Sequence, residues 1–385
     1  MDFRLTPEQE RIRVRARELA DTVFRERAAR WDAQEEYPWD NVKDLVHAGL
    51  MGLTVPREHG GLGGSVLDVI LVIEEAARAC GVTARIVVEG SLGVVGALAA
   101  YGTEAQKRRY FPWVLQGEKP AIAITEPEAG SAATDLRTTA EEAPEGYTLR
   151  GEKRWITGAG TSRLYLVYCR MGLAPGAEGI GGVFVERDTP GFRVGERDRT
   201  MGLRGIPEGR LYFEGCRVPR ENVLVGPPDG FKKLMQAYNG QRLGAAAVAL
   251  GLAQGAYELA LGYATQRRQF GRPIADFQGI RWKLAEMAIK LDAARLLIYR
   301  AAANAGRGFP DALEAAKAKT FAAEMAQEVT NQALQIHGAA GYGRALPLER
   351  MVRDARMFAI GGGTVEMMRN LIADRILPTR ADFRR

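Results

Sequence analysis

The chain has 385 residues, of which 46% are hydrophobic and 26% are charged, an ordinary composition for a globular protein that argues against long disordered segments. This length exceeds what one compact core needs and predicts two or three domains. The formal net charge is +6, but basic and acidic residues are interspersed, so we expect no nucleic-acid partner. The most apolar stretch, 245–253, is too short to cross a bilayer, and we expect no membrane association.

Cysteine and histidine usage indicates the compartment and the metal content. The three cysteines lie far apart, without the close spacing of a zinc or redox motif, which is typical of a reducing compartment. The three histidines show no metal-ligand spacing, so we predict no metal site. The polar N-terminal segment begins a predicted helix and lacks the pattern of a signal peptide. Together these features predict a cytoplasmic protein.

The first third of the chain is predicted to be helical. Residues 6–9, Thr-Pro-Glu-Gln, form a capping box with proline at the first helical position, which is a strong signal for a helix start. Apolar residues then recur at helical spacing over 67–79 and 90–101. We therefore assign residues 1–119 to an N-terminal helical domain.

The pattern changes near residue 120. Short apolar or alternating segments, separated by glycine, proline and aspartate, predict a middle β-domain over 120–228. Its predicted strands are 121–125, 147–150, 164–169, 182–186 and 210–213. Residues 229–385 return to a helical pattern and predict a C-terminal four-helix bundle. Its predicted helices are 231–269, 278–305, 310–338 and 363–377. The expected fold class is α+β and mainly α.

Two motifs in the β-domain suit a flat polar ligand. The turn at 124–131 (ITEPEAGS) offers backbone N–H groups and hydroxyls after a strand, although an ordinary surface loop has the same composition. Trp155 and Thr157 alternate along a predicted strand and therefore share one face of the sheet, which suits a stacked heterocycle. A tryptophan packed on the core would give the same pattern.

Two further motifs lie in the C-terminal part. Residues 266–273 (QRRQFGRP) place arginines at a predicted helix end, where they could reach a pyrophosphate or complement the helix dipole. Residues 335–343 (QIHGAAGYG) are small enough for a ligand or another backbone to approach closely. In this order and spacing, and with GGGT at 361–364, the motifs resemble the acyl-CoA dehydrogenase superfamily over the whole chain.

The resemblance implies an acyl-CoA dehydrogenase-like fold, an FAD cofactor and an acyl-CoA thioester substrate. The implied contacts to the flavin and thioester region are in the β-domain: Ile124, Thr125, Ser131, Trp155 and Thr157. The residues implied to reach the FAD of a neighbouring subunit are Arg267, Gln269 and Phe270, with Gln278 near its adenine half. The contacts implied for the pyrophosphate and the adenosine are Gln335, Gly338, Ala339, Thr364 and Glu366. Because this site is shared between chains, the resemblance implies a homotetramer, or at least a dimer.

The family's catalytic base is missing from its usual position. Family members usually abstract the substrate's α proton with a glutamate directly before a Gly-Thr pair, where this chain has Gly362. A minority carry the base on an earlier helix before an arginine, and here Gln241 precedes Arg242. Neither residue can accept a proton, and a positioned base contributes about 10²–10⁴ in rate. The chemistry has therefore changed, or another carboxylate has taken over the role.

Changed chemistry is favoured by a closer resemblance to one branch, the 3-sulfinopropanoyl-CoA desulfinases, in the segments 37–42 (YPWDNV), 204–208 (RGIPE), 241–242 and 361–364. In that branch an arginine on a helix lining the pocket binds the sulfinate, and Arg85 aligns with it. A buried guanidinium needs a charged partner, which a sulfinate would supply and a carboxylate would supply nearly as well. The implied reaction gives propanoyl-CoA and sulfite.

This interpretation assigns roles to a small set of residues. The implied catalytic residues are Arg85, Gly362, whose backbone N–H would polarise the thioester carbonyl, and Gln241. The implied substrate-binding residues are Arg85, Ser131, Gln241 and Arg242. Two alternatives stay open. A short-chain or dicarboxylic acyl-CoA α,β-dehydrogenase with Glu89 as relocated base would pass electrons to an electron-transfer flavoprotein, and a flavin-loaded protein without activity could bind acyl-CoA. Arg85 could also be an ordinary surface arginine.

Overall fold

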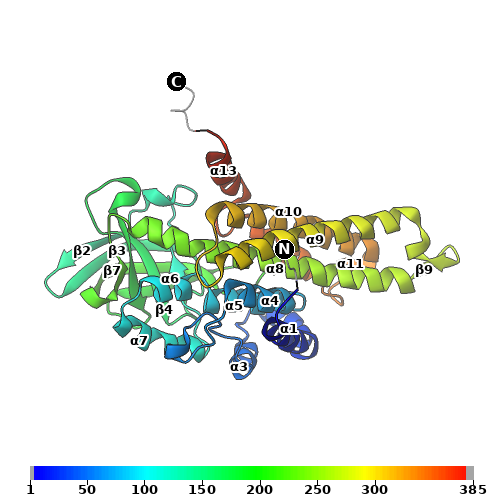
Figure 1. Cartoon of the computed structure of the whole chain (residues 1–385), viewed down its shortest axis with the longest axis horizontal. Helices are drawn as coiled ribbons and strands as arrows, with labels where there is room; N and C mark the ends of the chain where they lie inside the picture. Colours follow the sequence, from blue (N-terminus) through cyan, green and yellow to red (C-terminus); the bar gives the residue numbers. More distant parts are fainter. Residues whose placement is uncertain (1–3, 379–385) are drawn as a thin grey trace.

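The computed structural model describes residues 4–378. A sheet forms one end of an elongated molecule, long helices run away from it, and shorter N-terminal helices pack along their side (Figure 1). The predicted fold class, mainly helical with a central β-domain, is confirmed.

The N-terminal part is helical, as predicted. Helix α1 (Pro7–Leu19) begins with the predicted capping box, in which the Thr6 hydroxyl accepts from the Gln9 N–H and the Gln9 side chain accepts from the Thr6 N–H. A π-helical turn (Ala20–Phe24) leads into the next helix. The remaining helices are α2 (Arg25–Gln34), α3 (Trp39–His47), α4 (Val66–Ala77), α5 (Gly81–Ser91), α6 (Val94–Tyr101) and α7 (Glu104–Leu115).

The β-domain is one sheet in the order β6-β7-β3-β2-β4-β5-β8, with β1 paired parallel to β4. The predicted strands correspond to β1 (Ala121–Ala123), β3 (Gly146–Thr157), β4 (Leu164–Arg170), β5 (Ile180–Glu186) and β7 (Glu208–Pro219). Three strands were not predicted from the sequence: β2 (Thr139–Ala143), β6 (Phe192–Asp198) and β8 (Val223–Val225). Strand β6 lies at the edge of the sheet and is rich in charge, which is how natural edge strands avoid further pairing but which hides the alternating pattern.

Between residues 229 and 378 the chain forms three long α-helices and three shorter ones: α8 (Gly230–Gln266), α9 (Gln278–Ala305), α10 (Ala312–His337), α11 (Ala339–Tyr342), α12 (Leu348–Arg356) and α13 (Val365–Ile376). The prediction that the first long helix runs to residue 269 was wrong. Strand β9 (Arg268–Gln269) pairs with β10 (Arg272–Pro273) in a hairpin at the far end of the molecule (Figure 1). The tight turn uses Gly271 at φ +79°, a conformation that glycine adopts readily.

Helix α8 holds the parts together, because it packs against α4 and α5 on one side, α9 and α10 on another, and β5 at its N-terminal end. Glycine permits the closest of these approaches. A Cβ atom at Gly251 would lie 2.3 Å from the carbonyl oxygen of Glu74 on α4, and one at Gly255 would lie 2.2 Å from the carbonyl oxygen of Arg78. The small residues of α8 therefore serve helix packing.

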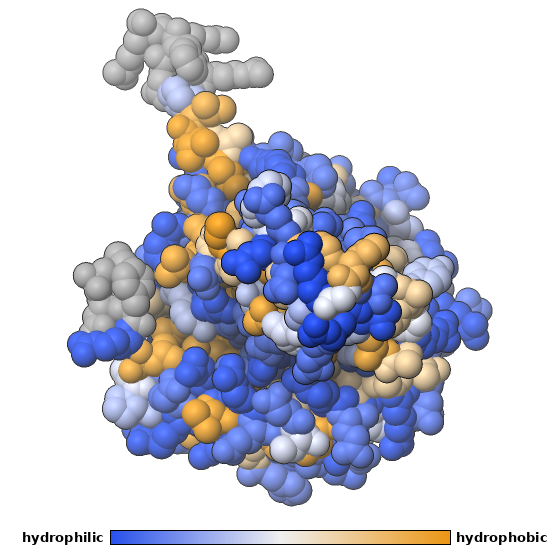
Figure 2. All heavy atoms as spheres, turned by 90° about the vertical axis from the view of Figure 1, so that its right-hand side faces the viewer, coloured by the Kyte–Doolittle hydropathy of each residue, from blue (hydrophilic) through white to orange (hydrophobic). Residues whose placement is uncertain are grey.

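Two helical stretches, Gly81–Tyr101 and Gly230–Gln266, are long and apolar enough to cross a membrane by length and composition alone. Of the windows that meet this criterion, 89% and 78% are buried inside the protein, as expected for core helices. The end view along the long helices shows a mostly hydrophilic face with scattered apolar patches, one of them on the projecting α13 (Figure 2).

Candidate active site

Elements from all three parts of the chain meet at Arg85. This residue lies on α5, every residue of which is buried, and its own exposed fraction is 7%. Its Nη2 lies 3.5 Å from the hydroxyl of Thr157 at the end of β3, and its Nη1 lies 3.9 Å from the sulfur of Met357, just before the 361–364 segment. Arg85 is therefore not a surface arginine.

A buried ion-pair chain fixes this guanidinium. The Nε of Arg85 donates to Glu89 one helical turn along α5 at 2.8 Å, and the other oxygen of Glu89 pairs with Lys119, which is 1% exposed. Burial opposes the charge on Arg85, but the Glu89 and Glu208 carboxylates outweigh it and raise the pKa of Arg85. The expectation that only a substrate anion would balance Arg85 was incomplete, because Glu89 is already a partner.

Lys119 is itself held tightly. Its Nζ lies 3.4 Å from the Thr157 carbonyl oxygen, and its own carbonyl oxygen accepts from the Ser162 hydroxyl at 2.7 Å. Gly158, at φ +93°, leaves room for this lysine, since an added Cβ would lie 2.4 Å from Lys119 Nζ. The result is a rigid cluster of two cations around Glu89.

A second carboxyl stands on the other side of Thr157. Glu208 begins β7 and is paired in register with Thr157 on β3. The Thr157 hydroxyl donates to Glu208 Oε1 at 2.7 Å. Burial raises the pKa of Glu208 to about 7, against the opposing effects of Arg85 and of the Thr157 hydrogen bond. Glu208 is thus divided between its acid and its ionised form near neutral pH.

The glycine segment where family members carry their base is held through its carbonyl groups. Arg242 on α8 donates from Nε to Gly362 O at 3.3 Å, and Lys319 on α10 donates to Gly363 O. Gly362 has φ +76° with open space where a side chain would be, and its N–H makes no hydrogen bond within residues 4–378. Burial and the neighbouring Arg242 lower the pKa of Lys319 to about 8.

Gln241 precedes Arg242 on α8 and is 6% exposed. Its side-chain oxygen is buried without a hydrogen-bond partner in the part of the chain that the structure describes. An unpaired buried amide oxygen is costly, so the position suits a bound group that donates a hydrogen bond.

The 124–131 loop is anchored by a buried ion pair that no sequence motif predicted. Lys153 is fully buried and donates to the Ile124 carbonyl at 2.9 Å and to Glu126 at 2.7 Å. The Arg154 N–H donates to the Thr125 carbonyl at 2.9 Å, while Ser131 is exposed. The ion pair positions the predicted flavin-contacting loop beside β3.

Trp155 is 51% exposed at a bulge of β3, where it has φ +57°. Its ring stacks with the Arg154 guanidinium at 4.8 Å and is not packed in the core. The alternative of a core tryptophan is therefore wrong, and the exposed ring belongs to a residue two positions before Thr157 on β3.

The other predicted cofactor residues lie elsewhere. Arg267, Gln269, Phe270, Gln335, Gly338 and Ala339 are exposed. The β9–β10 hairpin and α11 lie at the opposite end of the molecule from the sheet (Figure 1). Arg267 is about 40 Å along α8 from Gln241. Thr364 caps α13 by accepting from the Met367 N–H, and Glu366 lies in the first turn of that helix. Gln278 begins α9 beside the hairpin.

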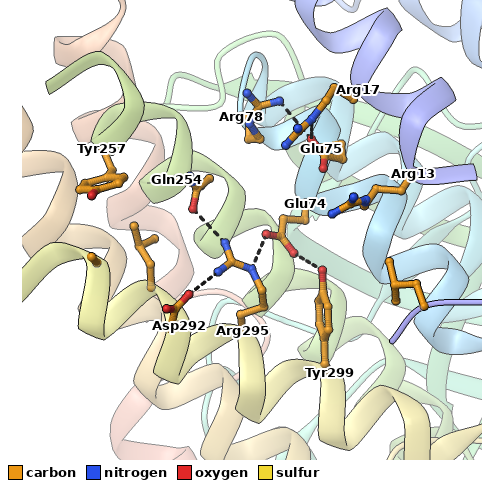
Figure 3. Close-up of a pocket in the computed structure, with 13 residues that line it drawn as sticks. Arg13, Arg17, Glu74, Glu75, Arg78, Gln254, Tyr257, Asp292, Arg295 and Tyr299 are labelled. Atoms are coloured by element: carbon orange, nitrogen blue, oxygen red, sulfur yellow. Dashed lines mark hydrogen bonds and ion pairs between the residues drawn. The ribbon is translucent and has the colours of Figure 1, made fainter. Parts of the chain in front are cut away.

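A separate polar cavity lies between α1, α4, α8 and α9 (Figure 3). Its charges are paired with one another. Arg295 contacts Glu74 at 2.9 Å and Gln254 at 2.8 Å, and Arg78 pairs with Glu75 at 3.0 Å. The network joins the four helices, and its satisfied charges indicate a structural role.

The comparisons with known proteins cover the whole described fold. The N-terminal, middle and C-terminal domains of the acyl-CoA dehydrogenase family match residues 6–118, 121–216 and 228–377. A 3-sulfinopropanoyl-CoA desulfinase of Paraburkholderia xenovorans is 50% identical, over 100% of this chain and 99% of its own length. One from Advenella mimigardefordensis is 48% identical, over 97% and 95%. The butyryl-CoA dehydrogenase structure from Megasphaera elsdenii has a TM-score of 0.95 at 34% identity, over 98% and 100%. The chain belongs to the acyl-CoA dehydrogenase family.

Proposed function

We propose that the protein is a cytoplasmic, FAD-containing desulfinase that cleaves 3-sulfinopropanoyl-CoA to propanoyl-CoA and sulfite. The observation that carries the proposal is the buried cluster around Arg85, together with side chains that cannot act as a base at positions 241 and 362. The near-full-length likeness to proteins of that activity supports it. Three buried, unpaired cysteine thiols are in keeping with the cytoplasm.

The charges of the cluster favour an anionic acyl group. Arg85 and Lys119 share Glu89, so this buried trio has one positive charge more than it has negative. Among residues 4–378, Nη1 and Nη2 of Arg85 have only the long contacts to Met357 and Thr157, and they can turn a bidentate edge to a ligand. A sulfinate on a three-carbon acyl chain would complete the charge balance. A plain fatty acyl chain would leave it incomplete.

The residues present fit a bound flavin. The orphaned oxygen of Gln241 suits a donor on the ligand, and the exposed ring of Trp155 suits a flat heterocycle. Ile124, Thr125 and Thr157 would line the flavin region. When bound, the FAD would supply a ribityl hydroxyl to polarise the thioester carbonyl. The free Gly362 N–H would donate to the same oxygen, and Ser131 and Arg242 would contact the rest of the acyl-CoA.

The distance between the two groups of cofactor residues favours a shared site. A single FAD cannot reach both the Gln241 region and the β9–β10 hairpin of one chain, because Gln241 and Arg267 lie about 40 Å apart along α8. A second copy could bring its exposed Arg267, Gln269 and Phe270 to the first, with its 335–339 segment. We therefore propose a homo-oligomer, a tetramer as the resemblance implies.

Glu89 is a poor candidate for a relocated base. Both of its oxygens contact buried cations, so a proton taken up there would break two ion pairs. The alternative is a dehydrogenase that passes electrons to an electron-transfer flavoprotein. It required Glu89 as its base, and these two ion pairs argue against that role.

The test is to incubate the flavin-loaded protein with 3-sulfinopropanoyl-CoA, without an electron acceptor, and to measure released sulfite. Arg85→Lys should lower kcat/KM by about 10- to 150-fold, because it loses charge-assisted hydrogen bonds worth about 1.5–3 kcal/mol. Arg78→Lys is the matched control, since Arg78 is equally buried and carboxylate-bound but belongs to the cavity of Figure 3. If the wild type releases no sulfite, the proposal is wrong.

A further inference from the structure

We propose that Glu208 is the proton donor of the desulfination, protonating the β carbon of the acyl group and regaining its proton from the water that captures the released sulfur dioxide. This inference rests on the proposed function and extends it. It assigns to a residue of this chain the proton transfer that cleavage of the carbon–sulfur bond requires.

The reaction requires such a group. When the bond between the β carbon and sulfur breaks, its electron pair stays on carbon, which must gain a proton to become the methyl group of propanoyl-CoA. The sulfinate sulfur leaves as sulfur dioxide. Addition of water to sulfur dioxide gives hydrogensulfite and releases one proton, which returns to the carboxylate. Carbon is reduced and sulfur oxidised within one molecule, so no external oxidant or reductant is needed, and Glu208 begins and ends as the acid.

The geometry puts this carboxyl beside the sulfinate anchor. The Thr157 hydroxyl stands between Glu208 and Arg85, 2.7 Å from Glu208 Oε1 and 3.5 Å from Arg85 Nη2. The antiparallel pairing of β3 with β7 fixes this relation through the backbone. Oε2 of Glu208 has no hydrogen-bond or ion-pair partner among residues 4–378, so it is the oxygen that can carry the proton. A group bound by Arg85 would therefore be separated from the Glu208 carboxyl by the Thr157 hydroxyl alone.

The surrounding charges favour the acid form once substrate is bound. Glu89 lies on α5 between Arg85 and Lys119 and is paired with both cations, whereas Glu208 contacts a hydroxyl and no cation directly among the described residues. The other titratable groups facing Glu208 are Tyr238 on α8 and Asp198, its pairing partner on β6. A bound sulfinate would add a negative charge at Arg85, and this charge would raise the pKa of Glu208 above its value of about 7 in the free protein.

Other side chains at the site are less suited to the step. Gln241 and Gly362 carry no exchangeable acid group. Glu89 is engaged at both oxygens, and Lys119 lies behind it. Glu208 is partly accessible and has a free oxygen. It combines access with a pKa near the operating pH, which general acid catalysis favours.

The experiment compares wild type, Glu208→Gln and Glu214→Gln for kcat, KM and the pH dependence of sulfite release. Glu214 is the control, because it lies on the same strand but is exposed and paired with Arg193 on the surface. We expect Glu208→Gln to lower kcat by about 10²–10⁴-fold with little change in KM. Wild-type kcat/KM should fall as pH rises through about 7, since the acid form is the active one, and the variant should lack this alkaline limb.

A second variant keeps the test decisive if Glu208→Gln does not fold. Thr157→Val removes the hydrogen bond that lowers the pKa of Glu208, so the alkaline limb should move to higher pH. Two results would overturn this inference and leave the proposed desulfinase activity standing. One is a normal kcat in Glu208→Gln with the same fall of kcat/KM at alkaline pH as in wild type. The other is a Thr157→Val variant whose kcat/KM falls at the same pH as that of wild type. Absence of sulfite from the wild type would overturn the proposed function and this inference with it.

Discussion

Replacing Glu89 with glutamine tests whether this carboxylate is a structural anchor or a base. In the folded protein, Glu89 receives the Arg85 Nε at 2.8 Å and pairs with Lys119, and all three side chains are at least 92% buried. Glu89→Gln leaves two buried cations without their shared partner. Removing one member of a buried ion pair usually costs about 3–5 kcal/mol, and we expect a loss of that size.

The compensating change is Lys119→Met. Alone, it leaves Glu89 paired with Arg85, so its loss should lie near the lower end of the same range, about 3 kcal/mol. Combined with Glu89→Gln, it removes one positive and one negative charge and restores the original charge balance around Arg85. The double variant should therefore be more stable than the sum of the single losses predicts, by about 0.5–3 kcal/mol.

The assay is urea unfolding of the flavin-loaded protein, at one protein concentration because bound ligand and self-association add to apparent stability. Sulfite release by the same variants separates the two roles. An anchor that orients Arg85 should affect KM more than kcat, whereas a base should affect kcat alone. Strictly additive losses of stability in the double variant, or a fall in kcat without any loss of stability in Glu89→Gln, would show that Glu89 is not a structural anchor.

Two further predictions concern packing and pH. Gly251→Ala should destabilise the protein by about 1–3 kcal/mol, because the added Cβ would lie 2.3 Å from the Glu74 carbonyl oxygen. Gly262→Ala, where the Cβ would have nothing within 4 Å, should stabilise the same helix by up to about 1 kcal/mol. The urea midpoints of the two variants test this prediction, and a higher midpoint for Gly251→Ala than for Gly262→Ala would contradict it. Asp354 is buried and accepts the Leu203 N–H at 2.6 Å, and burial raises its pKa to about 6. The contribution of Asp354 to stability is therefore lost as pH rises through about 6, by at most about 1.4 kcal/mol per pH unit. The unfolding free energies of Asp354→Asn and wild type, compared between pH 4.5 and 7, should differ less as the pH rises. A difference that stays constant with pH would contradict this prediction.

Much of the fold could be read from local patterns. The capping box at Thr6 marked the start of α1, the alternating runs marked β3, β4 and β5, and the Ala/Leu-rich segments marked the long helices. These signals depend on the period of a single helix or strand, which the sequence contains directly. The end of α8 was placed too late, because the polar residues 267–269 carry no period that separates a helix end from a short hairpin.

Sequence motifs were enough to identify the family, to show that positions 241 and 362 carry no base, and to predict a role for Arg85. The partners of Arg85 became visible only in the folded chain. Glu89 meets Lys119 from a loop 30 residues away, and Glu208 meets Thr157 across two strands 51 residues apart. Each of these charged residues looks like an ordinary surface residue in the sequence. Their burial, and with it the charge balance and the pKa of Glu208, follows from which strands and helices pack together, and no local pattern encodes that.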